Sequence, residues 1–306
     1  MKPFEFRTVT ASVVCAALPV CFASSARAMD DGTDLLELHT KDFSHPAEID
    51  NKWMPLKPGT QWVYSGWKID EEDHRIPYQR IVTVTDLIKD VNGMETVVVH
   101  EKDLANRKVE ISGLSFDAQD NEGNVWRLGE VKEFYDEDEK LIGARMWAAG
   151  LQDSRAGIVM PAKPTAGMPS YSEGYVAPPY DWHDRGQVRE AGAKVKVPAG
   201  TFENVLVTEE GSKGGPHTPP IEVKYHAPGV GYVKVNWLGK DPAKEGLELS
   251  SIVHLDAQQL DKVNSEAEEV EERADYYGLT TELPQRAKDH ENAQAFNARC
   301  ADTASK

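Results

Sequence analysis

The chain has 306 residues, of which 51 are acidic and 34 are basic, so its formal net charge is −17 at pH 7. A charge of this sign repels phosphate groups, which argues against nucleic acid and anionic lipid as partners and favours cationic ones. The length suits one large β domain or two small domains.

Residues 1–28 have the pattern of a secretory signal peptide. Lys2 and Arg7 give a basic start, residues 9–22 are mostly apolar, and Ala26-Arg27-Ala28 matches the small-x-small cleavage pattern. The apolar run is short for a membrane anchor, and no later stretch approaches about 20 apolar residues. We therefore expect an exported, soluble protein, periplasmic or secreted, with no membrane span.

Cleavage after Ala28 would change both the charge and the cysteine content. It leaves 31 basic and 50 acidic residues, a net charge of −19, and it removes Cys15 and Cys21. Cys300 then has no partner within the chain, so the stability of the protein has to come from its core.

After a leader at 29–59, the sequence predicts an antiparallel β domain over 60–255. Short runs with strand periodicity follow one another without an intervening helical pattern, which is typical of an all-β fold. Asn92-Gly93 is a strong hairpin signal, and 117–130 reads as the central hairpin of the meander. We expect about twelve strands in a barrel or a curved half-open sandwich, at 61–69, 80–87, 94–101, 108–119, 124–135, 140–147, 170–175, 188–197, 202–210, 221–226, 231–237 and 247–255.

Residues 256–306 are predicted to form a helical tail. Apolar residues recur at spacings of three and four, which is a helical seam, at Leu260, Val263, Ala267, Val270, Ala274 and Tyr277. The seam either packs on the β domain, pairs with a second copy as a homodimer, or belongs to a solvated single helix. A second, weaker helix is expected at 283–298.

Several strings resemble a group of exported bacterial β-rich proteins, most of them carried as hypothetical proteins. They are Pro55–Tyr64, Ala118–Trp126 with Gly129-Glu130, Gly157–Met160 with Pro161, Val197–Leu206 and Ala227–Lys234. The resemblance covers roughly residues 45–255 and implies export and an all-β fold. It brings no activity, cofactor or catalytic residue with it.

The best candidate site lies in the loop-rich stretch at 148–186, because long excursions from a compact domain often carry function. If 170–175 is extended, Tyr171, Glu173 and Tyr175 share one face, and a carboxylate between two phenols suits a binding site. Tyr180, Trp182 and His183 would form an amphipathic lid over a partly apolar ligand. The alternative is a proline-rich flap that packs its aromatic side chains on the domain surface.

Metal and cofactor signatures are weak. The turns near 70–74, 103–106 and 136–139 should share one acidic pole, which could attract calcium but also suits solvated turn tips. Asp117–Gly123 lacks the spacing of a calcium loop, and the nine histidines form no metal-binding motif. His226 shares a face with Glu222 and Lys224, so we expect it to point outward. We predict no metal and no cofactor.

The preferred interpretation is a protein that binds a small, partly apolar molecule in a cavity or groove of the β domain. The first alternative is an enzyme that uses the same pocket, with Glu173 or His183 as general acid or base. The second is an envelope structural or assembly protein that docks through its helical tail. A deep cavity lined by polar groups with shifted pKa values would favour the enzyme. A smooth apolar cavity would favour binding, and a filled interior with an exposed helical seam would favour assembly.

Overall fold

A computed structural model describes residues 35–70, 72–178, 181–212, 221–239, 245–274 and Tyr277. The predicted signal peptide at 1–28, the second helix at 283–298, Cys300 and the site residue Tyr180 lie outside the described residues.

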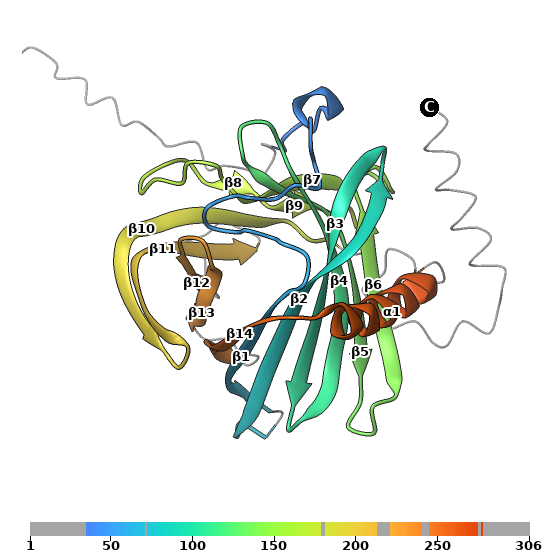
Figure 1. Ribbon diagram of the computed structural model, residues 1–306, viewed down its shortest axis with the longest axis vertical. Helices are drawn as coiled ribbons and strands as arrows, with labels where there is room; N and C mark the ends of the chain where they lie inside the picture. Colours follow the sequence, from blue (N-terminus) through green and yellow to red (C-terminus); the bar gives the residue numbers. More distant parts are fainter. Residues whose placement is uncertain are drawn as a thin grey trace, which may run out of the picture.

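The described strands form one antiparallel sheet of fourteen, which confirms the predicted all-β class (Figure 1). Among the described residues, a single turn of 3-10 helix, η1 (Thr40–Asp42), precedes the strands and one helix, α1 (Ala257–Ala274), follows them. The strands are β1 (Thr60–Ile69), β2 (Arg75–Val91), β3 (Met94–Ala105), β4 (Lys108–Gln119), β5 (Val125–Tyr135), β6 (Leu141–Ala148), β7 (Arg155–Met160), β8 (Tyr171–Ser172), β9 (Gly174–Tyr175), β10 (Asp184–Val197), β11 (Gly200–Ser212), β12 (Ile221–Ala227), β13 (Gly231–Leu238) and β14 (Glu245–His254).

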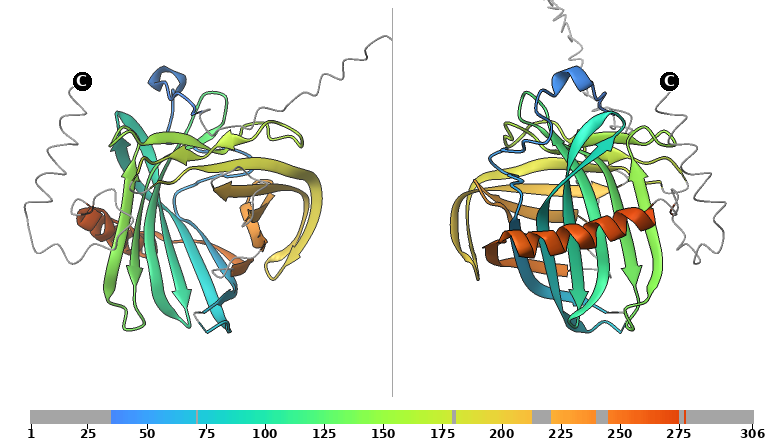
Figure 2. Two further views of the ribbon diagram at one scale, coloured as in Figure 1. Left: turned by 180° about the vertical axis from the view of Figure 1, so that it is seen from behind. Right: turned by 45° about the vertical axis from the view of Figure 1, so that its right-hand side comes forward.

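The two ends of the sheet meet in one short segment. The order runs β8-β10-β11-β12-β13-β14-β1-β2-β3-β4-β5-β7-β9, and β6 pairs with β5 off this path. The terminal strands β8 and β9 are separated in the chain by Glu173 alone. The strands curve around an interior (Figure 2), although the hydrogen-bonded ladder itself does not close. The two ends of the curved sheet are therefore joined by the chain between Tyr171 and Tyr175 and not by a ladder of hydrogen bonds.

β7 is the strand that sequence periodicity missed. It pairs with β5 and with β9, and it lies in the region marked by glycine and proline turns. Gly157 breaks its pattern for a structural reason, because a Cβ there would lie 2.3 Å from the backbone nitrogen of Gly174. Gly157 thus makes the strand hard to recognise in the sequence, and its lack of a side chain permits the close approach of β7 to the chain at 172–174.

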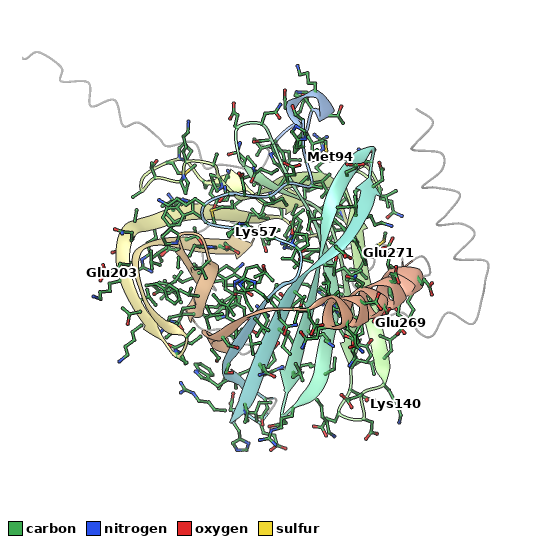
Figure 3. All side chains as sticks on the ribbon, in the orientation of Figure 1. Lys57, Met94, Lys140, Glu203, Glu269 and Glu271 are labelled. Atoms are coloured by element: carbon green, nitrogen blue, oxygen red, sulfur yellow. The ribbon has the colours of Figure 1, made fainter. Side chains whose placement is uncertain are left out.

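Alternate turns lie at opposite ends of the sheet, as the meander predicts. The β2–β3 and β4–β5 turns lie at one end, and the β1–β2, β3–β4 and β5–β6 turns lie at the other. Figure 3 shows Met94, next to the first set, and Lys140, in the second set, at the two extremes of this wall.

Helix α1 crosses the outer face of β2–β5 (Figure 2, right). Its seam residues Ala267, Val270, Ala274 and Tyr277 are buried in a cluster with outward-facing side chains of the sheet, among them Leu114, Phe116, Trp126, Leu128 and Val131. The helix is therefore packed on the β domain and is not a solvated single helix. The homodimer through this helix stays a prediction.

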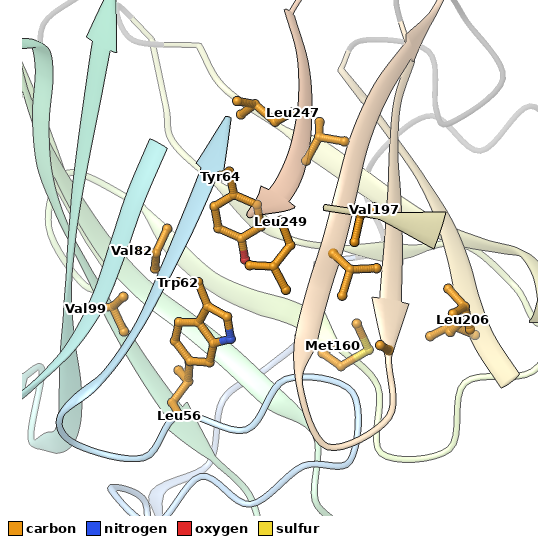
Figure 4. Close-up of a cluster of buried hydrophobic side chains, with 14 of the residues drawn as sticks. Leu56, Trp62, Tyr64, Val82, Val99, Met160, Val197, Leu206, Leu247 and Leu249 are labelled. Carbon is orange, nitrogen blue, oxygen red and sulfur yellow. The ribbon is translucent and has the colours of Figure 1, made fainter. Parts of the chain in front are cut away.

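A second apolar cluster fills part of the interior. Figure 4 shows Trp62 and Tyr64 of β1 between the strands that carry Val82 and Val99 and those that carry Val197 and Leu206. Both faces of the β2–β5 wall are thus buried, the outer one under α1 and the inner one around the interior.

The leader is tied to the turn of the central hairpin. Asn51 donates from Nδ2 to the carbonyl of Gly123 at 2.7 Å, and its backbone N–H donates to Gln119 Oε1 at 2.8 Å. Asp120 holds that turn, since its carboxylate accepts the N–H groups of Glu122 and Asn124 and the indole N–H of Trp126. These contacts place Met54 and Leu56 at the interior.

Candidate functional site

The interior contains a cavity of about 350 Å³. Its apolar lining comes mainly from Met54, Leu56, Trp62, Tyr64, Val82, Val99, Val159, Trp182, Tyr232 and Trp237. Its charged lining comes from Arg80, Glu101, Asp117, Arg127, Glu130, Lys132, Glu173, Asp184, Glu210, Glu222, Lys224 and Glu245. The cavity thus has the volume and mixed lining of a small-molecule site.

Strand periodicity divides this lining into an apolar part and a charged part. In β3, the residues that point inward are Val97 and Val99 near one end and Glu101 and Asp103 near the other. On the neighbouring strand β2, Val84 pairs with Val99 and Arg80 with Asp103, so the same order repeats. The apolar part lies at the end of the strands that is near the leader, and the charged part lies toward their other end.

Arg80 is surrounded by carboxylates. Its Nε and Nη2 each donate to Asp103 at 2.8 Å, and Nη2 also lies 3.2 Å from Glu245 Oε1. Glu101 Oε1 lies 3.6 Å from the Nε of Arg80, and Tyr78 donates its hydroxyl to Asp103 at 2.8 Å. One guanidinium therefore faces three carboxylates, and burial raises the pKa of Glu245 to about 7 against the opposing effect of Arg80.

Lys224 of β12 is also surrounded by more carboxylates than it can neutralise. Its ammonium group donates to Glu210, lies 3.4 Å from Glu222, and interacts electrostatically with Glu173. Burial raises the pKa of Glu210, Lys224 opposes this, and Glu222 adds to it. The pKa values of Glu210 and Glu245 are therefore shifted in the same direction on two walls.

Arg127 forms a balanced group by contrast. It donates to Asp117 Oδ1 at 3.0 Å and to Glu130 Oε1 at 3.0 Å, and Lys132 lies 3.6 Å from the same oxygen of Glu130. Two bases and two carboxylates therefore meet on β4 and β5.

Glu173 and Trp182 are the predicted site residues that line the cavity. The Glu173 residue is only 7% exposed, and its Oε1 has no hydrogen-bond partner. Trp182 packs against Trp147 with ring centroids 5.4 Å apart. The segment that joins the two ends of the sheet thus contributes a carboxylate to the interior, and the chain that follows β9 contributes an indole.

Burial raises the pKa of Glu173 well above its ordinary value. Glu210, Asp184 and Glu222 raise it further, while Lys224 lowers it. The protonated form of this carboxyl group is therefore favoured relative to a glutamate in water. It can donate a hydrogen bond or give up its proton to a base.

Tyr171, Tyr175 and His183 are not among the lining residues. Tyr171 packs on Gly186, where a Cβ would lie 2.4 Å from its ring. The Tyr175 ring meets His183 edge-on at 6.0 Å, and His183 Nε2 lies 3.2 Å from Ser172 Oγ.

Gly174 explains why Tyr175 departs from the regular alternation. Its φ of +147° interrupts the strand between Glu173 and Tyr175, and a Cβ there would lie 2.7 Å from the Trp182 ring. Tyr175 consequently meets His183, and Glu173 lines the cavity.

His226 corrects one expectation about direction. It shares a face with Glu222 and Lys224 as predicted, but that face is inward, and His226 is only 5% exposed. Its Nε2 lies 3.2 Å from Thr208 Oγ1. Burial and the nearby Lys224 lower the pKa of His226 to about 3, so the ring is neutral. The expectation failed because charged positions on this sheet line an interior.

Most of the lining residues were missed by sequence reasoning. Arg80, Glu101, Lys224 and Glu245 lie at alternate positions of ordinary-looking strands, where a charge normally marks the solvent face. One signal was available in the sequence. In β4, the apolar residues Leu114 and Phe116 alternate with Ser115 and Asp117, whose side chains can form hydrogen bonds, so both faces of the strand can make contacts within the protein.

Within the described part of the chain, no group of three or more His, Cys, Asp and Glu side chains is placed to hold a metal ion. The described residues also contain no helix long and apolar enough to cross a membrane.

No protein-family model and no curated protein matches the chain. Two solved structures resemble it in part. One is described as an exported protein with a YmcC-like fold from Bacteroides fragilis, with 13% identity and a TM-score of 0.40. The other is described as a lipoprotein from Parabacteroides distasonis, with 14% identity and a TM-score of 0.36. Each match covers 66% of this chain and 99% of the other. Neither likeness assigns a family or an activity to the chain.

Proposed function

We propose that this is an exported protein that binds a small, partly apolar molecule in the interior of its curved sheet. The observation that carries the proposal is the cavity of about 350 Å³, where the apolar side chains of β1–β3 meet charged side chains from both walls. Protein interiors are normally packed to crystal-like density, so an unfilled space of this size with polar walls suits a ligand.

Polar groups without partners support the same proposal. Trp62, Trp237 and Glu173 line the cavity, and the two indole N–H groups and the Oε1 atom of Glu173 lack hydrogen-bond partners. An unsatisfied buried polar group costs about 1–3 kcal/mol. A ligand with an acceptor for an indole N–H and a group that pairs with the Glu173 carboxyl would remove that cost.

An enzyme that uses the same cavity is the second candidate. Burial and neighbouring carboxylates raise the pKa values of Glu173 and Glu245, and shifted carboxyl groups in a cavity are typical of general acids. Glu173 would be the acid in this case, because His183 contacts Ser172 and Tyr175 and does not line the cavity.

The assembly alternative receives less support. It requires an exposed helical seam, and Ala267, Val270 and Ala274 of α1 are buried on the sheet. A docking role would have to use another face of the helix.

A fluorescence titration with the neutral probe N-phenyl-1-naphthylamine tests whether the cavity binds apolar molecules. Trp62, Trp182 and Trp237 line the cavity, so a bound probe should quench tryptophan emission and gain fluorescence. Val159→Phe fills part of the cavity and should weaken the probe's affinity at least tenfold.

Ile158→Phe is the matched control for Val159→Phe. Ile158 lies on the same strand, but its side chain packs on the cluster beneath α1. We expect this variant to bind the probe like the wild-type chain. Equal binding by all three proteins, or no saturable binding by any of them, would contradict the proposed site.

A further inference from the structure

The charges that line the cavity do not balance. The described lining residues include eight carboxylates, at 101, 117, 130, 173, 184, 210, 222 and 245, and four bases, at 80, 127, 132 and 224. Buried charges are normally paired, because an unpaired charge in a low-dielectric interior is costly. This excess of carboxylates favours protons on some of them or a positively charged guest.

Most of the bases are already engaged with carboxylates. Arg80 contacts Asp103 and Glu245, and Arg127 contacts Asp117 and Glu130. These side chains are held within their own ion-pair clusters. They are poorly placed to bind an added anion, since any such anion would also face the surplus carboxylates.

Glu173 is the carboxyl group that remains available. Its side chain interacts electrostatically with Asp184 of β10, Glu210 of β11, Glu222 and Lys224 of β12, and Tyr171 of β8. Three of these are carboxylates and one is a cation, so the local charge favours a second cation beside Lys224. The residue is 93% buried, and its free oxygen, Oε1, belongs to a side chain that lines the cavity.

Aromatic rings face the same space. Tyr64 and Tyr232 stack with ring centroids 4.5 Å apart, and Trp62, Trp182 and Trp237 also line the cavity. Aromatic faces attract organic cations and also accommodate the apolar part of such a molecule. A carboxylate excess next to several rings is the combination that selects an organic ammonium group.

We propose that the ligand is a small organic cation, an amine or quaternary ammonium compound with an apolar or aromatic body, whose positive group pairs with Glu173. This inference rests on the proposed function and specifies the ligand class of the same cavity. The body of the ligand would lie against Trp62 and Val82, and the ammonium group would lie among the carboxylates.

Binding of a cation should release a proton. Burial favours the protonated form of Glu173, and an ammonium group beside it would favour the ionised form. The cation would then take the place of the proton, and its affinity should increase as the pH rises from 6 to 8.

Isothermal titration calorimetry with three indole compounds tests the ligand class. Tryptamine, tryptophol and indole-3-propionate share a ring and differ in charge. We expect tryptamine to bind at least tenfold more tightly than tryptophol, and indole-3-propionate to bind most weakly. Titrations in buffers of different ionisation enthalpy should show up to one proton released with tryptamine and none with tryptophol.

Glu173→Gln isolates the carboxylate. It should weaken tryptamine binding about tenfold, abolish the proton release, and leave tryptophol within twofold of wild type. Glu190→Gln is the matched control, because Glu190 is exposed on β10 and does not line the cavity. It should behave like wild type with every compound.

The outcomes separate this inference from the proposed function. If N-phenyl-1-naphthylamine binds and tryptamine has no advantage over tryptophol, or if Glu173→Gln leaves the tryptamine affinity unchanged, the cation inference is overturned and the cavity remains a binding site. Calcium chloride that competes with tryptamine through Glu173 would also overturn it in favour of a metal ion. If none of the four organic probes binds, both proposals fall.

Discussion

Glu245 illustrates, at the scale of a single residue, the consequence of a carboxylate inside the sheet. It lies at the start of β14, close to Arg80, and lines the cavity as Glu222 does. Burial raises its pKa to about 7; Arg80 opposes the shift, while Glu222, Asp103 and Glu101 add to it. At neutral pH the ionised form of this side chain therefore destabilises the fold, and it adds negative charge to the cavity.

Glu245→Gln should consequently stabilise the protein at pH 8. In the folded protein the pKa is about 7, whereas an unfolded glutamate titrates near 4.5, so the ionised form is disfavoured on folding above pH 7. We expect a gain of about 1–3 kcal/mol at pH 8 that shrinks as the pH falls from 7 toward 4.5. Urea denaturation at pH 8 and at pH 5 measures the difference. A gain of equal size at both pH values would contradict this account of Glu245.

The same residue scale shows where sequence reasoning stops. Asn92-Gly93 and the alternation in β4 specify local conformation, and they were sufficient to predict the hairpins. The direction of Glu222, Lys224 and His226 depends on what lies beyond the strand, because a charged face suits solvent and a polar cavity equally well. Glu173 was chosen as a candidate because it lies in a short aromatic-rich segment, which is a local feature.

At the scale of elements, α1 is held to the sheet by apolar packing and by one buried carboxylate. Glu133 is fully buried and accepts hydrogen bonds from Arg273 Nε at 2.6 Å, Arg273 Nη2 at 2.9 Å, and the hydroxyls of Tyr135 and Tyr277 at 2.6 Å each. Burial alone would raise the pKa of Glu133, but these hydrogen bonds outweigh it and hold the pKa below its ordinary value. The contact fixes the end of the helix over β5.

Arg273→Ala should lower the free energy of unfolding by about 1–3 kcal/mol, because it leaves Glu133 buried with fewer donors. Arg273 is 39% exposed, so water can replace part of what is lost. Thermal and urea denaturation measure the loss. Glu272→Ala, at an exposed position of the same helix, is the control, and a loss of the same size there would show that the Glu133 contact is not the cause.

The element scale also explains which parts of the fold were predictable. The three-and-four spacing from Leu260 to Tyr277 predicts a helix, and the apolar side of β4 predicts a buried face. No local sequence pattern indicates that the helix and the apolar face of β4 pack together on the outside of the sheet. β7 escaped prediction because Gly157 serves a contact with the 172–174 segment, which lies far along the sequence.

At the scale of the whole molecule, the curved sheet is apolar on both faces at one end and charged on its inner face at the other. The helix covers the outer face, which leaves the inner charges around a cavity. The two ends of the sheet meet at Glu173, so the carboxyl group proposed to recognise the ligand also lies at the junction of the fold.

Native mass spectrometry of the protein purified from its own host tests the central claim most directly. We predict a non-covalently bound small molecule on the wild-type protein and on Ile158→Phe, and its loss from Val159→Phe. Wild-type protein with no bound molecule, or a molecule that persists in Val159→Phe, would contradict the claim that the interior of the sheet is a ligand site.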